Sequence, residues 1–399
     1  MKKAEIVIIG GGVVGASVAH HLTEKGAKDV LILERELKQG FGSTGKATGG
    51  VRAQFETEIN IKMSLYSLEF FKNWEFDCSY EPRGYLFFVT SEKGLEYLKR
   101  NVERQKSLGV KDVELVDKKT ISEICPILNC EDITGGTFGK NDGFINPLAV
   151  MNGFTKSALQ NGAKIEFDTE VFSIENANGK VKSVTTNKGE IECEKIILTT
   201  GAWAKNLAKT AGINLPVEPQ KRQIIWAQSK TDLPENLPMV IDLETGFHFR
   251  PARDWNAGIL PAMSAKREQT ANNEILFAYP DPFEENSFDT NFDESFIEKV
   301  YERAKHRSPF LYETKPILEK CRAGLYENTP DHHAILGKCS IEGLYLANGF
   351  SGHGVMHSPA TGRALSEIIL DGESKFLNIS CLRFERFSTG ELLHETAFI

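Results

Sequence analysis

An α/β fold with some α+β character is predicted by three observations on this 399-residue chain. The apolar run Ile6–Ile9 leads at once into the glycine-rich turn Gly10–Gly15, which is followed by apolar residues at helical spacing. A second apolar run, Val30–Leu33, follows that helix and ends in Glu34. The chain is also long for one compact core, which favours a second domain. Together these features predict a Rossmann-like unit near the N-terminus, joined to a further domain.

The glycine turn has the spacing of a pyrophosphate-binding motif. In its G-x-G-x-x-G pattern, Gly10 permits the tight bend, Gly12 lets the backbone approach phosphates, and Gly15 lets the helix pack closely on the strand. Glu34 stands where a carboxylate accepts hydrogen bonds from ribose hydroxyls. The alternative is an ordinary strand–helix–strand unit without a ligand, and the acid at this spacing disfavours it.

Composition and charge exclude several classes of partner. The formal net charge is -8 and there is no basic tail, so we expect neither nucleic acid nor an anionic membrane as partner. No apolar run reaches the ~18 residues of a membrane span, and the glycine motif argues against a signal peptide. The seven cysteines are odd in number and show no C-x-x-C pair, which favours reduced thiols and a cytoplasmic location.

Beyond Glu34 the chain alternates between ligand-type loops and regular elements. The glycine-rich segment 40–52 suits close contact with a flat ligand. The spacing predicts helices near 61–71, 95–108 and 148–159, with a strand at 85–89. Three short strands are expected over 164–198, and the third runs into a small-residue turn at Thr200 and Gly201.

The later part of the chain resembles an insertion followed by a return to the first domain. Residues 216–321 contain strand-like segments and a helix near 296–307, so we expect a substrate domain there. A short strand at 344–347 then leads into the glycine-rich loop 348–354. A helix should follow, with Ser358 as its N-cap and Pro359 as its first residue.

Taken together, these motifs resemble the D-amino-acid oxidase superfamily of FAD enzymes. Within it the sequence is most similar to the branch of sarcosine oxidase β-subunits and archaeal L-proline dehydrogenase β-subunits. The resemblance covers nearly the whole chain, and its most specific parts are the glycine motif with Glu34 and the segments 43–52, 324–337 and 349–359. It implies a GR-type FAD-binding domain formed by 1–80, 145–215 and 322–399. A substrate domain with a large mixed sheet, formed by 81–144 and 216–321, would lie over the flavin.

The resemblance also implies which residues contact the cofactor. Glu34 would bind the adenosine ribose, Val171 would contact the adenine through its backbone, and the loop 349–356 would pass beside the isoalloxazine. The full set of expected FAD-binding residues is Gly10, Gly12, Val13, Val14, Gly15, Glu34, Arg35, Ser43, Thr44, Gly45, Thr48, Gly49, Gly50, Val171, Thr200, Gly201, Trp203, Gly324, Gly349, Phe350, Ser351, Gly352, His353, Gly354, Val355 and Met356.

Departures from the relatives indicate non-covalent FAD. Monomeric sarcosine oxidases tether FAD through a cysteine, whereas the aligned residue here is Gly324 and Cys321 lies three positions earlier. The heterotetrameric β-subunits attach FMN to a histidine just before the helix near 148, where this chain has Asn146 and Pro147. The lysine that helps to bind the substrate carboxylate in monomeric enzymes is replaced by Met356.

Five residues are the candidates for substrate binding and catalysis: Arg52, His248, Tyr326, His353 and Met356. Arg52 aligns with a carboxylate-binding arginine, and a guanidinium binds a carboxylate through two parallel hydrogen bonds. The alternatives are a surface arginine or a protein ion pair. His353 lies between two glycines, where we expect little to pack against it, so it is a candidate to contact flavin or substrate rather than a structural histidine.

The remaining candidates have open alternatives. His248 shares a strand face with Arg250 while Phe247 and Phe249 point the other way, so it either orients the amine or faces solvent. Tyr326 stands where glycine oxidase and D-amino-acid oxidase would have an arginine, and it either binds carboxylate or walls the pocket. We expect no metal, because two adjacent histidines on a strand, 332 and 333, point to opposite faces.

The resemblance implies FAD-dependent oxidation of a small secondary or N-methylated α-amino acid, sarcosine-like or proline-like, by hydride transfer to flavin N5. One alternative is a 2-hydroxy-acid or glycerol-3-phosphate-type dehydrogenase on the same scaffold. Another is a non-catalytic FAD-binding or electron-relay subunit of a larger complex. A companion subunit is possible on this branch.

Overall fold

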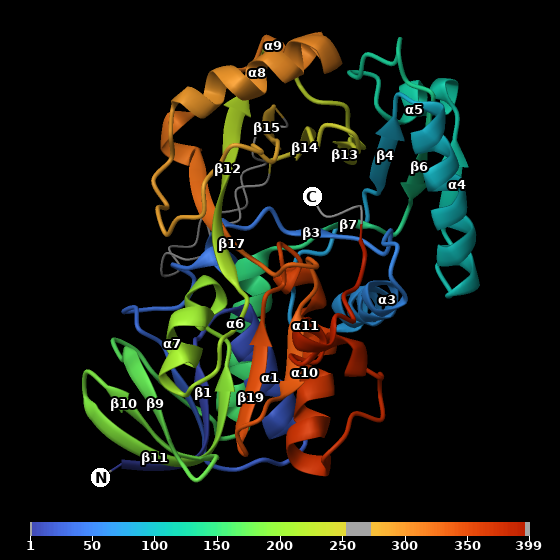
Figure 1. The fold of residues 1–399 in the computed structure, drawn as a ribbon. Coiled ribbons are helices and arrows are strands. Elements are labelled where there is room, and N and C mark those ends of the chain that lie inside the picture. Colours follow the sequence, from blue (N-terminus) through green and yellow to red (C-terminus); the bar gives the residue numbers. More distant parts are fainter. Residues whose placement is uncertain (1, 253–272, 396–399) are drawn as a thin grey trace.

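The computed structural model of the chain describes residues 2–252 and 273–395, which build two large β-sheets. In Figure 1 the eight-stranded sheet lies in the lower half and the nine-stranded sheet in the upper half, with α8 and α9 along the top. The fold is a mixed α/β fold with large mixed sheets, as the sequence predicts. Residues 253–272 of the expected substrate domain and 396–399 of the expected FAD domain lie outside the described residues.

The eight-stranded sheet is built around β1, which pairs in parallel with β2 and β11. Alternate residues of β1 enter two different hydrophobic clusters, Ile6 and Ile8 in one and Val7 and Ile9 in the other. Both faces of β1 are therefore buried, as is usual for parallel strands. The strands are β1 (Lys2–Ile9), β2 (Val30–Leu33), β8 (Lys164–Glu166), β9 (Val171–Ala177), β10 (Lys180–Thr186), β11 (Gly189–Leu198), β18 (Ile335–Lys338) and β19 (Leu344–Asn348).

The nine-stranded sheet has one face on a hydrophobic cluster and the other toward the first sheet. Phe249, Ile225 and Phe277 pack in the cluster beneath α8, while His248 on the same strand as Phe249 lines a cavity on the opposite side. The strands are β4 (Tyr85–Val89), β5 (Val113–Val116), β6 (Gly135–Gly139), β12 (Glu218–Gln228), β13 (Met239–Asp242), β14 (His248–Pro251), β15 (Glu274–Ala278), β16 (Lys315–Pro316) and β17 (Arg322–Asn328). A small separate pair joins β3 (Gly50–Val51) to β7 (Gly143–Phe144).

Helices cover the first sheet and the outer side of the second. The longest, α10, packs on α1 and α3, and α6 packs on α1. The helices are α1 (Val13–Glu24), α2 (Ser43–Lys46), α3 (Glu58–Asn73), α4 (Glu92–Ser107), α5 (Lys118–Ile124), α6 (Pro147–Gln160), α7 (Ala204–Thr210), α8 (Ser295–Arg307), α9 (Pro309–Tyr312), α10 (Gly354–Asp371) and α11 (Arg386–Thr389), with 3₁₀ turns at Gly201–Trp203, Leu318–Lys320 and Ser380–Leu382.

Two local expectations are wrong. Residues 164–198 form four strands rather than three, because residues 167–170 separate β8, which pairs with β2, from β9, which pairs with β10. The last long helix begins at Gly354 rather than after Ser358, and Pro359 lies inside it. Pro359 cannot donate to the carbonyl of Val355, and the Ser358 hydroxyl donates to that carbonyl instead, at 2.8 Å. The helix therefore continues through the proline.

The domain boundaries given above remain predictions. Strand β17, inside the expected FAD-domain segment 322–399, pairs along its whole length with β12 of the nine-stranded sheet. Within 2–252 and 273–395, no helix combines the length and the apolar character that crossing a bilayer requires. All seven cysteines fall within these ranges, and each is a free thiol.

Candidate cofactor and substrate site

A cavity of about 540 Å³ runs between the two sheets, within the size range of small-molecule sites. It extends from the end of β1 to the nine-stranded sheet. Of the five substrate candidates, three have no expected cofactor role, Arg52, His248 and Tyr326, and all three line this cavity. The expected cofactor residues on its wall are Gly10, Gly12, Val13, Val14, Glu34, Arg35, Ser43, Thr44, Thr48, Gly49, Gly50, Val171, Thr200, Gly201, Trp203, Gly324, Phe350, Ser351, Gly352, Gly354, Val355 and Met356.

Four expected residues lie behind this wall: Gly15, Gly45, Gly349 and His353. A Cβ at Gly15 or Gly45 would lie 2.0 Å from the carbonyl oxygen of Gly10 or Gly40, respectively, so each glycine permits a close backbone approach. Gly349 has a φ of 75° and donates its N–H to Glu327. These three glycines shape the wall without forming its surface.

The turn after β1 has no room for a side chain at Gly10. Gly10 has a φ of 107°, and a Cβ there would lie 2.6 Å from the carbonyl oxygen of Thr199. Gly12 precedes α1 and brings no capping side chain of its own, so the backbone at the start of the helix lines the cavity, with the Val13 N–H donated to Thr44. Such an open helix N-terminus favours an anion such as a pyrophosphate.

Glu34 is fixed at the end of β2 by two backbone groups. Its carboxylate accepts hydrogen bonds from the N–H groups of Gly11, at 2.9 Å, and Glu36, at 3.0 Å. Burial raises the pKa of this carboxyl, and the two hydrogen bonds act against that shift. The next residue, Arg35, lies over the ring of Trp203 at 3.9 Å, which covers one side of this end of the cavity.

The segment 43–52 is held by hydrogen bonds to α1 and to strands of the nine-stranded sheet. The Thr44 hydroxyl accepts a hydrogen bond from the Val13 N–H at 3.1 Å, and Ser43 donates to the carbonyl of Leu325 at 2.7 Å. From the nine-stranded sheet, Arg250 donates to the carbonyl of Thr48, and Arg322 donates to the carbonyls of residues 46 and 47. The flexible composition of this loop is thus offset by contacts with distant elements, which the local sequence does not reveal.

The loop before α10 is held by Glu327 and Tyr326 of β17. The Glu327 carboxylate accepts the N–H of Gly349 at 2.9 Å, and its backbone carbonyl accepts the N–H of Ser351 at 3.2 Å. Gly352 has a φ of 95°, and a Cβ there would lie 2.5 Å from the Tyr326 ring. Since α10 begins at Gly354, its first turn lies on the cavity wall.

Arg52 is almost fully buried, at 2% exposure. Its guanidinium lies 3.9 Å from the centre of the Phe55 ring and donates to the carbonyl of Gln54. Asp142 fixes the segment that follows, because it accepts hydrogen bonds from the Ala53 N–H at 2.7 Å and the Gln54 side chain at 2.9 Å. Burial lowers the pKa of Arg52, but its ordinary value is so high that the group stays charged.

His353 is packed rather than isolated, so the expectation that little packs against it is wrong. Its ring meets Phe55 edge-on at 5.0 Å, and its Nε2 accepts a hydrogen bond from Arg52 Nη2 at 3.5 Å. Burial, followed by the charge of Arg52, holds the pKa of His353 well below its ordinary value. His353 is therefore a neutral acceptor that fixes the Arg52 guanidinium.

His248 is also neutral, because burial lowers its pKa. Its Nδ1 donates to the carbonyl of Gly246 at 2.8 Å, so the unprotonated nitrogen is Nε2. The strand alternation correctly predicts that Phe247 and Phe249 point away from His248. Its position on the cavity wall favours the interpretation in which His248 faces a ligand.

The histidine pair 332 and 333 does not lie on a strand, so that expectation is wrong. Both residues lie in the turn between β17 and β18, and His333 donates from Nδ1 to the carbonyl of Asp331 at 2.7 Å. His332 has a φ of 57° and lines the cavity. The pair is therefore split between the site and the turn that supports it.

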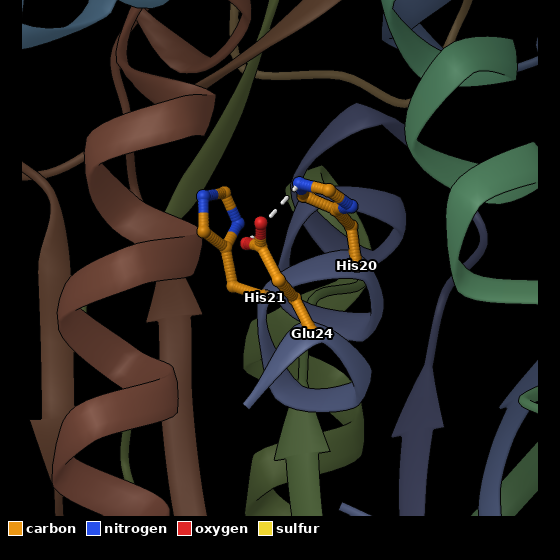
Figure 2. A group of neighbouring side chains, drawn as sticks. All are labelled: His20, His21 and Glu24. Carbon is orange, nitrogen blue, oxygen red and sulfur yellow. Dashed lines mark ion pairs between the residues drawn. The ribbon is translucent and has the colours of Figure 1, made fainter. Parts of the chain in front are cut away.

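Within the described ranges, one group of side chains has the composition of a metal site: His20, His21 and Glu24 of α1 (Figure 2). The His20 Nε2 lies 3.7 Å from a Glu24 oxygen. However, His21 Nδ1 donates to the carbonyl of Ser17 at 2.8 Å, so this nitrogen has no lone pair for a metal. Burial lowers the pKa of His20 to about 4 and that of His21 to about 3. We assign these rings to packing between α1, α3 and α6.

The family model described as "DAO: FAD dependent oxidoreductase" matches residues 5–368. The chain belongs to this family of FAD-dependent oxidoreductases. It is similar to "FAD-dependent oxidoreductase domain-containing protein 1" of Xenopus laevis, with 32% identity over 99% of this chain and 84% of the relative. It is also similar to mitochondrial dimethylglycine dehydrogenase of Homo sapiens, with 27% identity over 94% of this chain but 43% of that longer protein.

Among solved structures, the L-proline dehydrogenase from P. horikoshii is similar to this chain with a TM-score of 0.86. The two sequences are 29% identical, and the superposition covers 98% of this chain and 100% of the other. The fold and the sarcosine-like or proline-like resemblance drawn from the motifs are thereby confirmed.

The residues present fit FAD, the cofactor of this family. The turn after β1 admits only glycine at residues 10 and 15, Glu34 is held at the ribose position, and the open cavity continues to the start of α10. The residues that would hold FAD are those that the sequence predicts on the cavity wall. Sequence reasoning missed Tyr85, Asp142, Arg222, Arg322 and Glu327, which belong to no local motif and reach the site only through the tertiary fold.

Proposed function

We propose that the protein oxidises a small secondary or N-methylated α-amino acid, sarcosine-like or proline-like. The observation that carries this proposal is a charged, nearly buried guanidinium, Arg52, on the wall of the cavity that continues to the start of α10. The similarity of this chain to a dimethylglycine dehydrogenase and to an L-proline dehydrogenase supports the same substrate class.

The chain's own residues would bind and orient such a substrate. Arg52 would hold the carboxylate in two parallel hydrogen bonds, with its guanidinium fixed by Gln54 and His353. When bound, FAD supplies the acceptor, flavin N5, for the hydride of a carbon bonded to the amine nitrogen. Fixing the carboxylate would orient the C–H bond that is broken, and this orientation would accelerate hydride transfer.

The amine must be neutral to give up a hydride, and the cavity favours that form. Its wall includes apolar side chains such as Met239, Ile241 and Phe350, and desolvation disfavours an ammonium ion. His248 is neutral with an unprotonated Nε2, so it can accept a proton or a hydrogen bond from the amine.

Anaerobic mixing with a panel of compounds tests this function. Sarcosine, N,N-dimethylglycine and L-proline are expected to bleach the bound flavin, whereas 2-hydroxy acids and glycerol 3-phosphate are not. Bleaching by a hydroxy acid alone would favour the dehydrogenase alternative. A flavin that no amine or hydroxy acid bleaches, but that is reduced when a companion subunit is added, would favour the electron-relay alternative.

Three further expectations belong to the same proposal. FAD should be non-covalent, so denaturation with acid should release all of it into the supernatant.

A companion subunit would appear as a second chain that co-purifies with the native protein. A cytoplasmic location would follow if fractionation of the source cells recovers the protein with cytoplasmic markers.

A further inference from the structure

A second guanidinium, that of Arg222, lies on the cavity wall. Arg222 is on β12, where it pairs with Gly324 of β17, and its guanidinium is 5.3 Å from the centre of the Tyr326 ring. Ile224 and His248, which also line the cavity, lie on the same face of this sheet. Arg222 thus projects to the substrate side of the sheet rather than to the cluster beneath α8.

The described residues give Arg222 no ion pair. Its side chain donates one hydrogen bond, to the carbonyl of Lys221 at 3.2 Å. Of the two acids that influence it, Asp281 pairs with Lys299 at 2.7 Å and Glu284 lies 3.8 Å from the Lys221 ammonium. A half-buried guanidinium has five N–H groups, so most of its donors are available to an anion in the cavity.

Arg222 and Arg52 act on the same phenol. Burial raises the pKa of Tyr326, and the charges of Arg222 and then Arg52 act against this shift. Arg222 also lowers the pKa of His332, after the larger effect of burial and the contributions of Asp331 and His333. Arg222, Tyr326 and His332 come from three different places in the chain and line the same cavity as Arg52, and the charges of both guanidinium groups influence Tyr326.

We propose that Arg222 binds a second anionic group of the substrate, so that the preferred substrate is an amino acid with two carboxylates. This inference rests on the proposed function, because it assumes that Arg52 holds the α-carboxylate. The second carboxylate would extend past Tyr326 to Arg222. It could belong either to the side chain or to the substituent on nitrogen, and both would present the same chemistry to the guanidinium.

Steady-state kinetics with matched substrates tests the proposal. Sarcosine has one carboxylate, iminodiacetate adds one on the nitrogen substituent, and N-methyl-L-aspartate adds one on the side chain. We expect at least one dicarboxylate to have a KM at least about tenfold below that of sarcosine, as a charge-assisted hydrogen bond would give. Arg222→Gln should remove this preference, because it should raise the KM of the preferred dicarboxylate by at least about tenfold more than the KM of sarcosine.

Lys221→Gln is the matched control. Lys221 is the neighbouring cation on the same strand, but it pairs with Asp289 at 2.9 Å and does not line the cavity. This variant should keep the preference for the dicarboxylate. If Arg222→Gln raises the KM of all three substrates equally, or if neither dicarboxylate has a lower KM than sarcosine, the second anionic site is wrong while the proposed function stands. If no amine reduces the flavin, the proposed function itself is wrong.

A binding measurement covers the case in which Arg222→Gln loses FAD. Wild-type holoprotein is titrated with glutarate and with butyrate, and the perturbation of the flavin spectrum is followed. The proposal requires glutarate to bind at least about tenfold more tightly. Equal affinities would overturn it.

Discussion

The Glu327 side chain makes a structural hydrogen bond, but its ionised form is disfavoured by burial. It holds the loop before α10 through the N–H of Gly349, and burial raises its pKa from 4.5 to about 7. Between these two pH values the folded protein keeps a proton that the unfolded chain releases. The stability of the folded protein must therefore fall as pH rises from about 4.5 to about 7.

Glu327→Gln should remove this pH dependence and keep an oxygen that accepts the Gly349 N–H. Relative to the variant, wild type should lose on the order of 2 kcal/mol between pH 5 and pH 8, after allowance for solvent screening on the cavity wall. Thermal unfolding at both pH values, with saturating FAD, gives the comparison. A difference in Tm between the two proteins that does not change with pH would contradict the assigned charge effect.

At the residue scale, the sequence was informative wherever one local motif defines a role. The spacing of Gly10 and Gly15 predicts the turn, because a side chain at either position would strike the backbone. The role proposed for Arg52 rests on the resemblance to relatives, because no local motif defines it. Arg222 and Glu327 could not be predicted, because their roles arise from a strand pairing and a loop contact between distant parts of the chain.

At the scale of single elements, a side-chain hydroxyl replaces a missing backbone N–H in the first turns of α10. Pro359 leaves the carbonyl of Val355 without its usual helical partner, and the Ser358 hydroxyl supplies the hydrogen bond. Ser358 is completely buried, so no water replaces that hydroxyl.

Ser358→Ala should destabilise the protein by about 1 kcal/mol, since a buried carbonyl loses its donor. Pro359→Ala in the same chain restores a backbone N–H four residues after Val355, so the double variant should recover part of the loss. Thermal unfolding of the wild type, both single variants and the double variant completes the cycle. Strictly additive effects would show that the hydroxyl does not replace the missing N–H.

The same helix explains a failed prediction. Serine followed by proline is a good local signal for a helix start, but here the helix begins at Gly354, five residues before the predicted first residue, Pro359. Packing of α10 on α1 outweighs the local preference: a Cβ at Gly362 would lie 2.3 Å from the Ser17 hydroxyl, so the two helices are in close contact. Element type was predictable from periodicity, whereas this boundary depended on the tertiary fold.

At the scale of the whole molecule, one buried ion pair ties the C-terminal segment to the turn beside the site. Arg386 of α11 and Asp331 are both fully buried, and their atoms approach to 2.7 Å. The second guanidinium nitrogen bonds Asp331 at 2.9 Å and the carbonyl of His333 at 2.9 Å. The turn that carries His332 into the cavity therefore depends on the end of the chain.

Arg386→Met should cost about 3 to 5 kcal/mol, because it leaves the Asp331 carboxylate buried without its partner. Adding Asp331→Asn should return much of that loss, since the uncompensated charge is then gone. Denaturant unfolding of the FAD-saturated proteins measures both effects. If the single variant loses less than about 1 kcal/mol, the pair does not hold the turn.

The two-sheet architecture was accessible from the sequence, but the way in which the sheets enclose the cavity was not. The glycine motif and the return of the chain at 344–354 predict the first sheet. Contacts such as Arg322 to the carbonyls of the 43–52 segment join regions almost three hundred residues apart, and no local pattern encodes them.

The most direct test of the central claim, that Arg52 anchors the substrate carboxylate, compares sarcosine with its amide. Anaerobic reduction of the bound flavin is followed in wild type and in Arg52→Ala. Wild type should be half-saturated by sarcosine at a concentration about 100-fold below that for the amide, and Arg52→Ala should lose this difference. Equal reduction by both compounds in wild type, or a preference for sarcosine that persists in Arg52→Ala, would contradict the account.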